Sequence, residues 1–161
     1  MSEELTPGRK APDFSLSSDT GETLSLKSFK GKQVVLYFYP KDDTPGCTKE
    51  ACDFRDAMAS LLKTGAVVLG VSLDGEESHR KFRAKHHLPF SLLSDRDASV
   101  SRTYGVYKEK NLYGKKHWGI ERSTFVIDRA GVMKGMFRNV KVDAHVADVL
   151  AVLKKTSPHY S

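Results

Sequence analysis

One continuous apolar run, residues 34–39 with the sequence Val-Val-Leu-Tyr-Phe-Tyr, constrains the fold more than any other feature of this chain. A run of β-branched and aromatic residues predicts a strand buried on both faces, as in a sheet covered by helices. Pro40 ends this strand. Thr44 and Pro45 follow as a typical N-cap and first position of a helix. The sequence therefore predicts a strand-to-helix connection of the kind at which α/β proteins often bind ligands.

The rest of the chain supports a three-layer α/β fold with a mixed sheet. The 161 residues fit one domain over 1–161, with a loose lead-in at 1–12. Periodicity and turn residues predict the remaining elements. Strands are expected at 13–16, 23–26, 66–73, 91–93, 124–127 and 132–137, helices at 47–63, 76–87, 98–104 and 143–155, and an irregular, Lys-rich loop at 106–119.

Charge and composition argue against several classes of protein. The formal net charge is +6 and the pI is about 9.3, but acidic and basic residues alternate, and we expect no nucleic-acid partner. Residues 1–10 are polar and show no signal peptide, and no apolar stretch is long enough to span a membrane. We therefore expect a cytoplasmic protein, in which thiols are kept reduced and a pair of cysteines serves chemistry more often than it serves as a structural staple.

The two cysteines, Cys47 and Cys52, lie at the start of the predicted helix. Cys47 falls in the first turn, where free backbone N–H groups and the positive end of the helix dipole favour an anion. This position favours the thiolate, which is the nucleophilic form of cysteine. Gly46 adds no bulk beside the sulfur. Cys47 is therefore our candidate nucleophile.

Cys52 cannot reach Cys47 while both residues belong to an intact helix. Five residues turn the helix by about 500° and raise it by about 7.5 Å, so the two Cα atoms would be about 8.7 Å apart. A disulfide needs about 4.4–6.8 Å between Cα atoms. If the pair forms a disulfide, the first turns of the helix must unwind.

Other uses of these cysteines remain possible from the residues alone. A structural zinc site needs about four ligands, and the two cysteines and scattered histidines show no ligand spacing that we recognise. A cysteine hydrolase needs a base, for which His117 is available without an evident orienting partner. Either cysteine could also be a small buried hydrophobe, and Thr44 could be only a helix cap.

Several stretches resemble the peroxiredoxins, and within them the bacterioferritin comigratory protein (PrxQ) group. The pattern Pro40-x-x-x-Thr44-x-x-Cys47 is similar to the family's active-site motif, and Cys52 five residues on is similar to the subgroup's resolving cysteine. Arg122, followed by Ser-Thr-Phe-Val-Ile-Asp, is similar to the later strand that carries the family's arginine. The likeness covers about residues 5–155.

The resemblance implies a thioredoxin-like α/β/α fold and a thiol peroxidase that needs no metal or organic cofactor. Cys47 would be the peroxidatic cysteine and Cys52 the resolving one, joined in an intrachain disulfide that thioredoxin or glutaredoxin reduces. Pro40 would shield the sulfur, Thr44 would hydrogen-bond thiolate and peroxide, and Arg122 would polarise the substrate oxygens. Hydrogen peroxide and organic hydroperoxides would be the substrates, and the intrachain pair favours a monomer.

The position of Arg122 also follows from the strand pattern. If the strand at 124–127 runs antiparallel to the strand at 34–39, its beginning lies beside Cys47. Rival hypotheses are a general thiol–disulfide oxidoreductase, which usually has Cys-x-x-Cys, and a redox sensor or holdase chaperone that uses the same pair as a switch. A nucleic-acid-binding module is supported by net charge alone.

Overall fold

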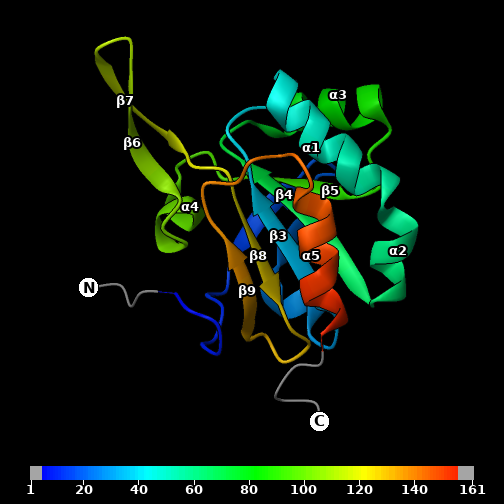
Figure 1. Cartoon of the computed structure of the whole chain (residues 1–161). Helices are drawn as coiled ribbons and strands as arrows, with labels where there is room; N and C mark the ends of the chain where they lie inside the picture. The colour runs from blue at the N-terminus through cyan, green and yellow to red at the C-terminus, as the bar shows by residue number, and fades with distance from the viewer. Residues whose placement is uncertain (1–4, 156–161) are drawn as a thin grey trace.

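The computed structural model describes residues 5–155, in which a seven-stranded mixed sheet is covered by helices (Figure 1). The strand order is β2-β1-β5-β4-β3-β8-β9. The strands are β1 Ser15–Ser18, β2 Thr23–Ser25, β3 Gln33–Phe38, β4 Ala66–Ser72, β5 Ser91–Ser94, β6 Tyr107–Leu112, β7 Lys115–Ile120, β8 Ser123–Ile127 and β9 Met133–Phe137. The helices are α1 Pro45–Asp56, α2 Met58–Lys63, α3 Glu76–His86, α4 Ser99–Thr103 and α5 His145–Lys154, with a 3-10 turn at Leu26–Phe29.

Strand β3 lies in the middle of the fold and is buried along its whole length. Its side chains alternate between two cores. Val35 and Tyr37 pack with residues of α1, α2, α3 and α5, whereas Leu36 and Phe38 pack with residues of α4 and the 3-10 turn. This two-sided burial explains the continuous apolar run and confirms the predicted α/β/α architecture with a mixed sheet.

The neighbours of β3 determine which residues meet at its carboxyl end. Strand β4 pairs with β3 in parallel, and β8 pairs with it antiparallel. Phe38 near the end of β3 faces Ser123 at the start of β8. The antiparallel register expected from the sequence is confirmed, and it brings Arg122 to the carboxyl end of the central strand.

The prediction of a single helix at 47–63 is wrong in one respect. The chain bends at Ala57, whose φ of −94° and ψ of 6° separate α1 from α2. Phe54 before the bend and Leu61 after it are both fully buried. Both helices therefore pack against the core, one on each side of the bend.

The loop predicted at 106–119 is also wrong, because this segment forms a separate two-stranded antiparallel sheet of β6 and β7. A two-residue turn joins the strands, and its residues Tyr113 and Gly114 have positive φ values of 54° and 77°. The hairpin extends from the body of the molecule in Figure 1, and Tyr113 at its tip is 96% exposed. Both strands are mostly exposed, so the alternation of buried and exposed residues that reveals a strand is absent here.

Within residues 5–155, no helix has the length and apolar character needed to cross a membrane. The first four residues of the expected lead-in lie outside the described residues, as do both ends of the expected domain.

Candidate active site

The connection from β3 to α1 places Cys47 in the first turn of the helix. Thr44 is the N-cap residue with extended backbone angles, and Pro45 is the first helical residue, as predicted. The Thr44 hydroxyl does not cap the helix with its side chain. It donates to the backbone carbonyl of Lys41 over 2.9 Å. The N-cap position is therefore confirmed, whereas the Thr44 hydroxyl hydrogen is directed to Lys41 and not to the Cys47 sulfur.

The Cys47 sulfur is buried and contacts a guanidinium group. Cys47 is only 1% exposed, although we expected an open approach past Gly46. Arg122 Nη2 donates to Cys47 Sγ over 3.3 Å. A Cβ atom at position 46 would lie 3.1 Å from this Nη2 atom. The glycine therefore makes room for the arginine, and the arginine places a permanent positive charge where a thiolate would form.

Glu50, which the sequence reasoning missed, holds the other side of the guanidinium group. Arg122 Nη1 donates to Glu50 Oε1 over 2.7 Å, and the carboxyl group is fully buried. Burial raises the pKa of Glu50 to about 7, although the positive charge of Arg122 opposes this rise. Glu50 lies three residues after Cys47 and therefore on the same helix face, which is the one signal that could have revealed it.

A buried histidine extends this network toward α5. His145 Nε2 and the Thr124 hydroxyl are hydrogen-bonded over 2.7 Å, and the same Nε2 lies 4.0 Å from Glu50 Oε2. Burial lowers the pKa of His145 to about 4, so its ring is neutral at neutral pH. Sequence reasoning missed both residues, because nothing in their spacing connects them to Cys47.

The other predicted site residues lie near Cys47 in the chain without a direct bond to its sulfur. Cys52 is half-buried on the same uninterrupted helix α1, and both cysteines are free thiols. Pro40 is half-buried at the end of the central strand. His117, considered above as the base of a hydrolase, lies exposed on the projecting strand β7, whereas Cys47 is buried at the start of α1.

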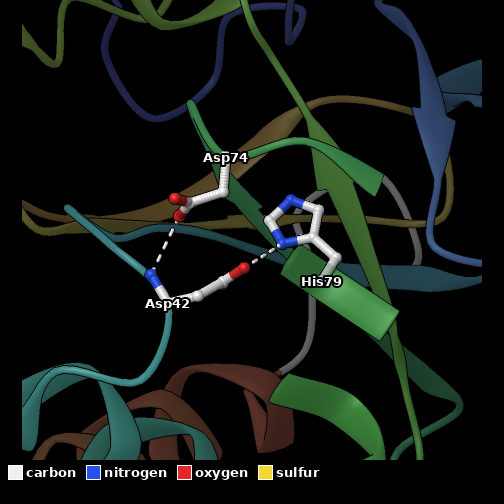
Figure 2. Close-up of side chains that lie close together, drawn as sticks. All are labelled: Asp42, Asp74 and His79. Atoms are coloured by element: carbon white, nitrogen blue, oxygen red, sulfur yellow. Dashed lines mark hydrogen bonds and ion pairs between the residues drawn. The ribbon is translucent and has the colours of Figure 1, made fainter. Parts of the chain in front are cut away.

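Figure 2 shows a second polar cluster, formed by Asp42, Asp74 and His79, beside the same loop. The three side chains offer ligand atoms within 4.8 Å of one another. These atoms already bond within the protein. His79 Nδ1 faces Asp42 Oδ2 at 2.7 Å, His79 Nε2 faces the carbonyl of Leu93 at 2.9 Å, and Asp74 Oδ2 accepts from the backbone N–H of Asp42 at 2.8 Å. Nδ1 thus ties the loop to α3, and Nε2 ties α3 to β5, so both ring nitrogens of His79 already have partners.

The chemistry available at Cys47 is that of a nucleophilic sulfur. The thiolate would sit at a helix N-terminus beside Arg122, and the guanidinium group has donors for both the sulfur and a substrate oxygen. Such a site stabilises negative charge on an atom that leaves as the sulfur attacks. The thiol of Cys52, on the same helix, can then displace the group bound to the Cys47 sulfur if the helix opens.

Comparison with known proteins supports the same thiol chemistry. Residues 7–136 match the model of the family described as AhpC/TSA. A putative peroxiredoxin bcp of Coxiella burnetii is 58% identical over 146 residues, which are 91% of this chain and 97% of that protein. Peroxiredoxin Bcp of Bacillus subtilis is 53% identical over 150 residues, which are 93% of this chain and 96% of that protein.

Solved structures are also similar. The bacterioferritin comigratory protein of Xanthomonas campestris, studied for its alkyl peroxide reduction activity, matches with a TM-score of 0.84 and 45% identity, covering 88% of this chain and 90% of that one. A PrxQ mutant of Xylella fastidiosa matches with a TM-score of 0.89 and 36% identity, covering 94% of this chain and 97% of that one.

Proposed function

The chain belongs to the AhpC/TSA family and is a peroxiredoxin, and on that premise we propose that Cys47 is its peroxidatic residue and Cys52 its resolving residue. The observation that carries this assignment is the 3.3 Å contact between Arg122 Nη2 and Cys47 Sγ. The Cys47 sulfur, in the first helical turn, accepts a hydrogen bond from a guanidinium group. Cys52 lies more than a full turn further along the helix.

In the first step, the Cys47 thiolate attacks the terminal oxygen of a peroxide ROOH. The S–O bond forms as the O–O bond breaks, and the leaving alkoxide takes up a proton to give ROH and a Cys47 sulfenic acid. Arg122 and the N–H groups of the first turn stabilise the charge that develops on the leaving oxygen. The Thr44 oxygen accepts a hydrogen bond from the O–H group of the peroxide, since its own hydrogen is directed to the Lys41 carbonyl. Pro40 shields the sulfur from water.

In the second step, the Cys52 thiol attacks the sulfur of the sulfenic acid. The S–S bond forms, the S–O bond breaks, and water leaves with the proton of the thiol. Because both residues belong to the intact helix α1, this step requires the first turns of the helix to unwind. The helix that activates Cys47 thus also separates it from Cys52.

An external dithiol completes the cycle by thiol–disulfide exchange, and we assign this role to thioredoxin or glutaredoxin. The substrates are hydrogen peroxide and organic hydroperoxides, in keeping with the alkyl peroxide activity of the Xanthomonas campestris relative. No step needs a metal or an organic cofactor. We further propose that the chain works as one domain, as a monomer, in the cytoplasm, where it contributes to antioxidant defence and redox homeostasis.

A steady-state peroxidase assay with a thioredoxin system tests the two assignments. Wild-type protein should turn over, and Cys47→Ser should be inactive because it lacks the attacking sulfur. Cys52→Ser should consume one equivalent of peroxide and then stop, since its sulfenic acid has no partner thiol. Full steady-state activity in either variant would overturn the assignment. Absence of turnover in a wild-type protein that still forms the disulfide would favour a redox sensor instead.

A further inference from the structure

Asp42 is a buried carboxylate that takes no part in the chemistry described above. It lies two residues before Thr44, and its side chain is held by hydrogen bonds from two elements. Tyr39 Oη, at the end of the central strand, donates to Asp42 Oδ1 over 2.5 Å. Ser78 Oγ on α3 donates to Asp42 Oδ2 over 2.8 Å. A buried carboxylate is costly unless it is paired, so this site is built around the charge of Asp42.

His79 completes the pairing from α3. Its side chain is fully buried, and its Nδ1 lies 2.7 Å from Asp42 Oδ2. Its Nε2 lies 2.9 Å from the carbonyl of Leu93, which can only accept, so Nε2 carries a hydrogen. The imidazole therefore bridges the loop before α1 and strand β5. Figure 2 shows His79 directed at Asp42 from its helix.

Helix α3 also holds the neighbouring residue of this loop. Asp43 has a φ of 60°, a left-handed conformation that is unfavourable for a residue with a Cβ atom. Its carboxylate accepts from Lys85 Nζ over 2.8 Å and lies 3.2 Å from His86 Nε2. Near the other end of α1, Arg55 Nη1 donates to the carbonyl of His86 over 2.8 Å. Helix α3 thus holds the chain on both sides of the cysteines.

We propose that the Asp42–His79 pair is a positioning unit of the peroxidase. It fixes the loop from Pro40 to Thr44 on α3, so the unwinding of α1 starts after Thr44 and Cys47 returns to Arg122 after each cycle. This inference depends on the proposed function, because it concerns the opening that lets Cys52 reach Cys47.

The held loop limits how far α1 can open. Local opening spreads until it meets interactions that cost more than the opening gains. The α1 backbone beyond Thr44 is held mainly by its own helical bonds, whereas the side chain and the backbone N–H of Asp42 are held by side chains from three other segments. Loss of the His79 contact would leave a buried carboxylate short of a donor, which is destabilising enough to let the loop move with the helix.

Amide hydrogen exchange tests directly whether the loop from Pro40 to Thr44 stays in place. The backbone N–H of Asp42 donates to Asp74 Oδ2 and so reports whether the loop stays in place. In wild-type protein, oxidation with hydrogen peroxide should remove protection from the first turns of α1 and leave the Asp42 amide protected. If the Asp42 amide loses protection as much as the helix does, the loop opens with α1 and the inference is wrong.

Two substitutions of His79 separate positioning from simple packing. Asn has its amide nitrogen at the same number of bonds from Cα as Nδ1, so His79→Asn keeps a donor toward Asp42. Gln reaches the position of Nε2 instead, so His79→Gln keeps the contact with Leu93 and loses the one with Asp42. Phe82→Leu is the control, since Phe82 is a buried apolar residue of the same helix.

The rate constant for Cys47 oxidation by hydrogen peroxide is measured by rapid quench and thiol alkylation, together with the urea midpoint of each variant. His79→Gln should slow oxidation by about tenfold, the effect of losing one charged hydrogen bond, whereas His79→Asn should recover most of the rate. Phe82→Leu should lose stability and keep its rate.

Either of two results would show that the Asp42–His79 pair contributes only packing. One is equal rates in His79→Gln and His79→Asn, and the other is a loss of rate in Phe82→Leu that matches its loss of stability. If the wild type itself reacts no faster than free cysteine, the proposed function fails. If the wild type reacts rapidly and every variant matches it, only the positioning inference fails.

Discussion

Replacing Glu50 with Gln should remove the contribution of one buried carboxyl group to the pH dependence of this protein's stability. The pKa of Glu50 is about 7 in the folded chain because the group is buried, against an ordinary value of 4.5. Between these two values the folded state keeps a proton that the unfolded state has released, so stability falls as the pH rises. Each pH unit in this interval costs about 1.4 kcal/mol, and the whole interval ~3 kcal/mol. The loss is complete above about pH 7.

His145 has the opposite effect in an overlapping range of pH. Burial lowers its pKa from 6.5 to about 4, so the unfolded state binds a proton that the folded state does not, and stability falls as the pH decreases. In the wild type the contributions of Glu50 and His145 largely cancel between about pH 4.5 and 6.5. Glu50→Gln keeps only the His145 contribution, so the variant should gain stability as the pH rises through this range.

The assay is urea unfolding at about pH 5 and about pH 8, carried out in a Cys47→Ser background so that sulfur ionisation does not contribute. The free energy of unfolding of Glu50→Gln, relative to its parent, should increase by about 2.5 kcal/mol between the two pH values, because pH 5 already lies inside the interval. Any pH-independent cost of replacing the carboxyl group with an amide cancels in this comparison. The exposed Glu22→Gln should show a flat difference. A flat difference for Glu50→Gln as well would refute the account of its buried carboxyl group.

Three further predictions concern the reaction itself. Arg122→Met should slow Cys47 oxidation by about 10²–10³-fold in a competition assay for hydrogen peroxide, the effect of losing one donor at a developing charge, whereas the exposed Arg129→Met should react normally. Gly46→Ala should also slow oxidation, because its Cβ atom would displace Arg122 Nη2, while the helix becomes no less stable; an unchanged rate would mean that the guanidinium position is unimportant. Amide exchange should show that the first turns of α1 lose protection when the disulfide forms, and equal protection in reduced and oxidised protein would contradict the required unwinding.

The central part of the site could be predicted because it depends on local signals. The apolar run of β3, followed by Pro40, identifies a buried strand and its end. Thr44 and Pro45 identify the start of a helix, which fixes the turn that contains Cys47. Arg122 could be placed through one assumption about the pairing of two strands, and the observed register confirms it.

The parts that were missed depend on contacts between segments distant in the sequence. From the sequence alone, Glu50 resembles an ordinary surface residue of a charged helix, and only the folded chain places Arg122, which directly precedes β8, against it. His79 and His145 are among six scattered histidines, and only the packing of α3 and α5 shows that they are buried. The β6–β7 hairpin was missed for the opposite reason, since exposed strands carry no burial pattern.

A single-turnover experiment tests the central claim most directly. Reduced protein is mixed with one equivalent of hydrogen peroxide, quenched at increasing times, and mapped by alkylation and mass spectrometry. We predict that Cys47 loses its free thiol far faster than free cysteine does, that a sulfenic acid forms on Cys47 first, and that the final product is a Cys47–Cys52 disulfide within one chain. Thiol loss no faster than that of free cysteine, or a disulfide that joins two chains, would contradict the account.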